Sequence, residues 1–431
     1  MSASNKISDP AAAYKRQPST LPGQRRPIVK QLLTLVAVGV ALVLLFLTVL
    51  FVALSVADSP LYAWRILRYG QSDTEDYKIF PARPIETGST VSTIPTGEPV
   101  TIQEVDYPYN GAPRTEALAD LLKRTDTKAF LILQNDQLIM EIYLTSSRDS
   151  IHTSFSSAKS VNSALIGAAL ADGYIGSLSD PVIKYIPEIA GRGLDALTIQ
   201  DLLLMNSGIR YVEGNELPFY YAPFADDALT YYSADMRKTA LSVRAGDTPL
   251  GQAFHYNNYH PLLEGVILER ATGMHVAQYV QERFWQPMGA AFPASWSLDS
   301  EASGFEKMES GINARAIDYA RFGLIFLHNG FWNGKEILPA SWVRKSTEPL
   351  RPDPRTWETM SDWPDYNGYY KYHWWGINNA DGSYDFYAHG HYDQIVYVAP
   401  RKNAVIVRLG NAPDTQLKWP LVLHDIVDQL P

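Results

Sequence analysis

Ser156 and Lys159 stand three residues apart, and this spacing points to chemistry more directly than any other pair in the chain. They open an apolar run of small residues with helical periodicity, so one helical turn would place both side chains on the same face. A serine hydroxyl is a weak nucleophile until an adjacent base takes its proton. A lysine can be that base where apolar surroundings lower its pKa. The pair predicts nucleophilic attack on a carbonyl group, but Ser-x-x-Lys alone is a common pattern, so the prediction depends on the rest of the chain.

A tyrosine and an asparagine in residues 254–258 (Phe-His-Tyr-Asn-Asn) form the second polar group. The phenol of Tyr256 has a free pKa of about 10, close to that of lysine, so a proton would pass between the two groups at low cost. Tyr256 is therefore a candidate proton shuttle beside the nucleophile. In a purely structural interpretation, Tyr256 is a core aromatic, Asn258 caps the following helix, and Pro261 lies in the first turn of that helix.

The third group is residues 387–394 (Tyr-Ala-His-Gly-His-Tyr-Asp-Gln), within the last predicted strand pair. A glycine inside a strand, here Gly390, usually marks the close approach of another group's backbone. The strand edge would supply a backbone N–H to an oxyanion hole, together with the N–H of Ser156. Tyr392 and its neighbours are the candidate second donors. The alternative is an ordinary turn and strand with surface histidines.

A zinc site is the main alternative chemistry, because His389-x-His391-x-Asp393 matches the first half of a His-x-His-x-Asp-His motif. Gln394, however, occupies the position of the last histidine, and the nine histidines form no other clear ligand cluster. We therefore expect neither a metal nor another cofactor. The sequence also lacks the Gly-x-Ser-x-Gly elbow, which argues against a Ser-His-Asp hydrolase.

Together, Ser156-x-x-Lys159, Tyr256-x-Asn258 and the late His-Gly pair resemble the motifs of the serine β-lactamase and penicillin-binding-protein superfamily. The most similar branch is the class C-related one, which includes family VIII esterases and 6-aminohexanoate-dimer hydrolases. The resemblance implies that Ser156 forms an acyl-enzyme, that Lys159 holds or takes the serine proton, and that Tyr256 relays it to the leaving group. It also implies that Asn258 orients Lys159 or the substrate amide.

Two further stretches resemble the same branch: residues 201–209 (Asp-Leu-Leu-Leu-Met-Asn-Ser-Gly-Ile) and residues 311–323 (Gly-Ile-Asn-Ala-Arg-Ala-Ile-Asp-Tyr-Ala-Arg-Phe-Gly). The resemblance therefore covers about residues 115–431. The third family motif is commonly Lys or His, any residue, then Gly. Here His391 stands where that glycine is expected, or else Ala388 replaces the basic residue. The departure disfavours recognition of a β-lactam carboxylate and favours an esterase or amidase.

The substrate side of the site is expected to include His389, Gly390, His391, Tyr392 and Asn258, with Trp374 and Trp375 lining an acyl-binding groove. The substrate is expected to be a small ester or amide. Neither its identity, nor hydrolysis versus transfer to another acceptor, nor the oligomeric state follows from the sequence. The non-enzyme alternative is a catalytically inactive penicillin-recognising domain used for binding. The joint presence of serine, lysine and tyrosine argues against it, because binding needs none of them.

The N-terminal part of the chain predicts a membrane anchor. Residues 31–57 contain no charged residue and are long enough to cross a bilayer, which needs about 20 apolar residues. The basic tail of residues 1–30 should stay in the cytoplasm, which leaves the catalytic body on the periplasmic or extracellular side of the inner (plasma) membrane. The alternative is a signal peptide cleaved after Ser55-Val56-Ala57, but the apolar run is too long for a typical one.

Composition supports a globular acidic body. The net charge of the chain is −9 although its N-terminus is basic, and this argues against nucleic acid as a partner. The chain has no cysteine, which excludes disulfides, thiol catalysis and cysteine metal sites.

Two segments follow the predicted span. Residues 58–115 read as a Pro/Thr/Ser-rich stalk, with Tyr62, Trp64, Arg65 and Arg68 suited to the membrane interface. Residues 116–431 read as a serine hydrolase domain with strands at both ends and helices between. The expected fold is therefore α+β and β-lactamase/transpeptidase-like, an antiparallel sheet flanked by helices with a helical subdomain, preceded by one transmembrane helix.

Overall fold

The computed structural model describes residues 1, 25–411, 414 and 416–431, so most of the predicted basic tail lies outside the described part. The described chain forms two compact units, Met1–Ala53 and Leu54–Pro431. The first unit contains most of helix α1 (Arg25–Ala57). In helix α1, the segment Val29–Ala57 is long and apolar enough to cross a membrane. A signal sequence near an N-terminus meets the same criteria of length and composition.

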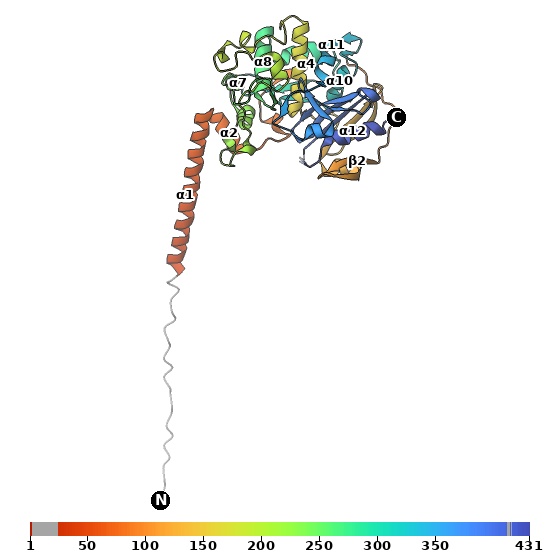
Figure 1. Ribbon diagram of the computed structural model, residues 1–431. Coiled ribbons are helices and arrows are strands. Elements are labelled where there is room, and N and C mark those ends of the chain that lie inside the picture. The colour runs from red at the N-terminus through yellow and green to blue at the C-terminus, as the bar shows by residue number, and fades with distance from the viewer. Residues whose placement is uncertain (2–24, 412–413, 415) are drawn as a thin grey trace. The chain divides into compact units, whose positions relative to one another are not determined.

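The second unit is built on a seven-stranded antiparallel sheet, as expected (Figure 1). Its strand order is β13-β14-β15-β16-β17-β4-β5, so the β4–β5 hairpin pairs through β4 with the last strand of the chain. The strands are β4 (Thr127–Gln134), β5 (Gln137–Tyr143), β13 (Gly368–Lys371), β14 (Trp374–Asn378), β15 (Tyr384–Gly390), β16 (Gln394–Ala399) and β17 (Ala404–Gly410). Asn135 and Asp136 have φ angles of 51° and 63°, which suit the tight hairpin turn between β4 and β5.

Helices cover both faces of this sheet. Alternate side chains of β4 belong to different cores, Leu131 and Leu133 to one and Phe130 and Ile132 to the other, as the two-residue strand period requires. The first core packs against α4 (Ala158–Ala171), α8 (Tyr259–Thr272) and α10 (Ala316–Leu327), and the second against α3 (Leu118–Arg124) and α12 (Trp419–Gln429). This gives a helix–sheet–helix sandwich.

Shorter elements complete the body. The helical subdomain contains α5 (Ile199–Leu203), α6 (Asp226–Tyr232), α7 (Met236–Ala240) and α9 (Val276–Val280), and α11 (Ala340–Thr347) follows later in the chain. A four-stranded sheet pairs β1 (Ala82–Ile85), β8 (Ala294–Ser297), β9 (Ile312–Ala314) and β6 (His152–Thr153). Three strand pairs remain: β2 (Glu104–Tyr109) with β3 (Ala112–Ala117), β7 (Ala253–Phe254) with β12 (Thr356–Trp357), and β10 (Phe331–Trp332) with β11 (Lys335–Glu336).

The segment after the apolar helix differs from the expected extended stalk. Helix α2 (Pro60–Tyr69) begins at Ser59, whose hydroxyl accepts a hydrogen bond from the backbone N–H of Tyr62. Strand β1 pairs with β8, and the β2–β3 hairpin packs on α12. The reason is that apolar residues spaced through the Pro- and Thr-rich stretch, among them Ile85 and Ile102, are buried against the body.

Candidate active site

Ser156 and Lys159 meet at the start of α4, as their spacing predicted. Ser156 lies in a short turn, Phe155–Ser157, and Lys159 in the first turn of the helix. The Nζ atom of Lys159 donates to Oγ of Ser156 at 2.8 Å and to the backbone carbonyl of Glu309 at 3.1 Å. Burial lowers the pKa of Lys159 to about 7, against the opposing effect of nearby carboxylates, of which Glu309 has the largest. A neutral amine beside the serine is therefore well populated near neutral pH.

Tyr256 contacts both members of this pair. Its ring centre is 4.8 Å from Nζ of Lys159, and its hydroxyl is hydrogen-bonded to Ser156. Burial raises the pKa of Tyr256 well above its ordinary value, so the phenol keeps its proton at neutral pH. The Ser156 hydroxyl, the Lys159 amine and the Tyr256 phenol are thus close enough to pass a proton from one to another.

The backbone around the nucleophile is held tightly. Phe155 has a φ of 44°, a left-handed conformation that is uncommon for a bulky residue. A Cβ atom at Gly390 would lie 2.2 Å from the carbonyl oxygen of Ser154 and 3.0 Å from the backbone N of Ser156. Strand β15 therefore approaches the nucleophile turn as closely as a glycine allows, which is the close backbone approach that the mid-strand glycine predicted.

A pocket of about 430 Å³ opens at Ser156. Most of the residues assigned to substrate binding from the sequence line it, while Trp374 and Asn258 do not. The lining residues are Ser156, Tyr256, Met360, Asp362, Trp363, Trp375, Tyr387, His389, Gly390, His391, Tyr392, Asp393, Asp414, Leu417, Lys418 and Pro420. The lining combines five tyrosine and tryptophan side chains with three carboxylates and Lys418, a suitable setting for a small, partly apolar substrate.

The prediction for Trp374 is wrong. Its side chain is fully buried in the core on the opposite face of the sheet, where it packs against Phe322 and Phe326. Trp375 faces the pocket instead. Neighbouring strand residues point to opposite faces, so only one of the two tryptophans could belong to the site.

The two histidines of the third motif have separate surroundings. Nε2 of His389 lies 2.9 Å from Oδ1 of Asp393, whereas the ring of His391 packs against Phe155 and Tyr392. Burial lowers the pKa of His391, which favours the neutral ring. Within the described residues these groups do not converge as a ligand set. Among the same described residues, the ligand atoms that do lie close enough together to hold a metal ion belong to Glu269, His275 and Glu306, in another part of the body.

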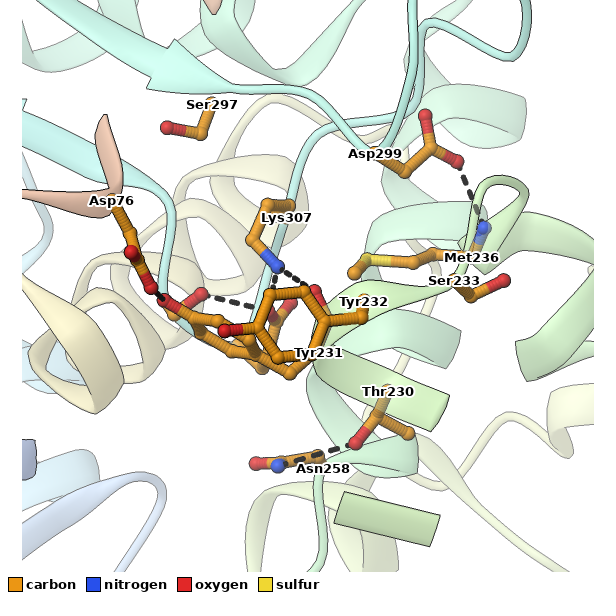
Figure 2. A network of polar contacts seen from close by, with 12 residues as sticks. Asp76, Thr230, Tyr231, Tyr232, Ser233, Met236, Asn258, Ser297, Asp299 and Lys307 are labelled. Carbon is orange, nitrogen blue, oxygen red and sulfur yellow. Dashed lines mark hydrogen bonds and ion pairs between the residues drawn. The ribbon is translucent and has the colours of Figure 1, made fainter. Parts of the chain in front are cut away.

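Asn258 lies near the site without touching the lysine. Its amide nitrogen donates to the hydroxyls of Tyr211 at 3.0 Å and Thr230 at 3.3 Å, the latter drawn in Figure 2, so the predicted orientation of Lys159 by this side chain is not seen. Asn258 precedes α8 without capping it through its side chain. The neighbouring Asn257 accepts from the backbone N–H of Tyr259 at 2.8 Å instead.

Sequence reasoning missed the buried charges behind Lys159. Lys307 and Glu309 form an ion pair, and Figure 2 shows the Lys307 ammonium beside the ring of Tyr231. A second buried pair is formed by the Glu264 carboxylate, which lies 2.9 Å from Nε2 of His373, and both groups are fully buried. One signal was available: Glu264 interrupts an otherwise apolar helical run, and a buried charge needs a partner.

Comparison with known proteins places the chain in a family. The β-lactamase family model matches residues 116–423, so the chain belongs to that family. It is 28% identical over 311 residues to a 6-aminohexanoate-dimer hydrolase of Paenarthrobacter ureafaciens, covering 70% of this chain and 77% of the relative.

Two solved structures show the same fold. A Bacillus anthracis protein provisionally assigned as a 6-aminohexanoate-dimer hydrolase has a TM-score of 0.68 at 24% identity, covering 84% of this chain and 94% of that one. A family VIII carboxylesterase has a TM-score of 0.51 at 16% identity, covering 69% and 90%. The protein is thus a member of the β-lactamase family, and its fold is shared with a family VIII carboxylesterase.

Proposed function

We propose that the protein is a membrane-anchored serine hydrolase that cleaves an ester or amide bond through an acyl-enzyme on Ser156. The observation that carries the proposal is the 2.8 Å contact between Nζ of Lys159 and Oγ of Ser156, made by a lysine whose pKa burial lowers to about 7. The relatives named for 6-aminohexanoate-dimer and carboxylester hydrolysis support an amide or ester as the substrate class.

In the acylation step, neutral Lys159 accepts the Oγ proton while Oγ of Ser156 bonds to the substrate carbonyl carbon. The backbone N–H groups of Ser156 and of the strand edge after Gly390 are the proposed donors to the developing oxyanion. The phenol of Tyr256 gives its proton to the departing amine or alkoxide and is reprotonated from Lys159. Water then attacks the acyl-enzyme, transfers a proton to the same groups, and releases the acid and free Ser156.

The anchor is the second half of the proposal. Residues 29–57 form one uninterrupted apolar helix, and the preceding basic residues would hold the N-terminus in the cytoplasm. The catalytic body would then lie on the outer side of the membrane, where a chain without cysteine has no thiol to oxidise. Partition of the full chain into washed membranes tests the anchor directly. Recovery of a mature N-terminus close to Ala57 would show a cleaved signal peptide instead.

The test of the nucleophile is the intact mass of the full-length protein in detergent after exposure to a fluorophosphonate. One adduct is expected on the parent and none on Ser156→Ala. Ser157→Ala is the matched control, because the hydroxyl of Ser157 donates to the carbonyl of Gln394 at 2.6 Å and so is already occupied. An adduct on Ser156→Ala would refute the assignment. No adduct on any of the three would favour a binding domain.

A further inference from the structure

Exposed aromatic side chains gather on two segments of the body that are far apart in the sequence. Phe219, Tyr220 and Tyr221 precede α6 and are 86%, 58% and 54% exposed. In α2, Trp64 is 55% exposed, and the flanking Leu61 and Leu67 are exposed as well. Single exposed apolar residues are ordinary, but a group of them marks an interaction surface. We call Leu61, Trp64, Leu67, Phe219, Tyr220 and Tyr221 the aromatic surface.

A hydrogen bond joins the two segments that carry the aromatic surface, helix α2 and the loop before α6. The hydroxyl of Tyr62, on the buried side of α2, donates to the backbone carbonyl of Pro223 at 2.7 Å. Phe219 is four residues before Pro223, so chain length alone keeps it within about 14 Å of that contact. Helices α2 and α6 also pack directly against each other. The loop and the helix therefore belong to one region of the body.

The same region holds the end of the apolar helix. The carboxylate of Asp58, one residue after α1, accepts hydrogen bonds from the hydroxyl of Ser233 at 2.6 Å and from the backbone N–H of Ala234 at 3.2 Å. Leu54, in the last turn of α1, is buried and belongs to the body. If α1 crosses a membrane, the start of α2 lies close to the headgroups, because only Asp58 and Ser59 separate the two helices in the chain.

We propose that the aromatic surface docks onto the lipid bilayer next to the membrane span, so that the catalytic body lies on the membrane. This inference rests on the proposed anchor. Tryptophan and tyrosine favour the membrane–water interface, where the ring contacts acyl chains and the polar atom reaches headgroups and water. Tyr62 and Arg65 have a different role from the one expected. Both are buried, and Arg65 holds backbone carbonyls of the body, including that of Tyr232.

Docking on this side would bring the catalytic pocket close to the lipid. Tyr392 lines the pocket, and its hydroxyl donates to the carbonyl of Ser72 at 2.6 Å. Ser72 is three residues after the end of α2, so it lies within about 11 Å of that end along the chain. Substrates that partition into the membrane surface would then be concentrated at the pocket.

The absence of cysteine allows a direct test in the full-length protein. A single cysteine carrying a nitroxide is placed at Phe219→Cys, and its collision rates with oxygen and with a water-soluble nickel complex are measured in phospholipid nanodiscs. Phe331→Cys is the matched control, because Phe331 is also an aromatic residue, 54% exposed. It lies in β10, which packs against α10, and Figure 1 shows α10 on the opposite side of the body from α2. Val43→Cys reports on α1 itself.

The expected result is an oxygen-to-nickel ratio at position 219 shifted toward that at position 43, with the control at position 331 remaining at the value for water. If the label at position 43 is in lipid but the ratio at position 219 equals that at position 331, docking is refuted while the anchor still holds. Protection of position 219 from both reagents would indicate a protein contact, such as a second copy, and would also refute lipid docking. A label at position 43 that stays in water would refute the anchor and this inference together.

Discussion

Nζ of Lys307 lies 2.9 Å from Oε1 of Glu309, and both side chains are almost completely buried behind the catalytic pair. The backbone carbonyl of Glu309 accepts from Lys159, and its carboxylate is the strongest charge that opposes the drop in the Lys159 pKa. The ion pair therefore connects a second buried lysine to the catalytic one through a single residue.

Replacing this carboxylate should change the pH dependence of turnover. In Glu309→Gln the negative charge that raises the pKa of Lys159 is lost, so the pKa of Lys159 should fall from about 7 to a lower value. The acid limb of the kcat/KM profile should then move to lower pH. The variant should also lose about 3–5 kcal/mol of stability, because Lys307 is left as an unpaired buried cation. Rate profiles and thermal unfolding measure the two effects.

The double variant Lys307→Met/Glu309→Gln separates these effects. Removing both charges should recover most of the stability, since a buried ion pair is often replaceable by neutral residues. The acid limb should still lie below that of the parent, because the carboxylate near Lys159 is gone. A limb at the parental position in both variants would show that Glu309 does not tune the lysine.

The parent itself should show one acid limb near neutrality. Attack by Ser156 needs the neutral amine of Lys159, whose pKa is lowered to about 7, so kcat/KM should fall about tenfold per pH unit below that value. Burial raises the pKa of Tyr256, so its phenol should cause no loss of activity between pH 7 and its ordinary pKa of about 10. An acid limb below about pH 5 would point to a carboxylate base instead.

Tyr256→Phe removes the hydroxyl bonded to Ser156 while keeping the ring beside Lys159. We expect kcat to fall by roughly 10²–10⁴, the usual range for loss of a positioned acid–base group. Tyr143→Phe makes the same change in edge strand β5, away from the pocket, and should leave kcat unchanged. Equal kcat values for the two variants would rule out a proton relay through Tyr256.

Gly390→Ala tests the close approach of β15 to the nucleophile turn. The new methyl group would collide with the carbonyl of Ser154 at 2.2 Å, so the strand and Ser156 must separate and activity should be lost. Gly176→Ala is the control, because its nearest neighbour, at 3.1 Å, is the flexible carboxylate of Asp180. Full activity of Gly390→Ala would mean that this approach does not position the nucleophile.

The sequence by itself determined the local parts of this protein. Helical spacing brought Ser156 and Lys159 together, and strand alternation with a tight turn at Asn135 gave the β4–β5 hairpin. These features depend on residues close in the chain, whose periodicity fixes which face they share. The apolar length of residues 31–57 likewise followed from composition alone.

Only the tertiary structure decided which distant groups meet. It placed Trp375 in the pocket and Trp374 in the opposite core, although both have the same local pattern. It folded the presumed stalk onto the body and put the buried Lys307–Glu309 pair behind Lys159. These outcomes depend on which sheet face a helix covers and on how buried charges are paired. Such choices minimise free energy over the whole chain, so no local window of sequence contains them.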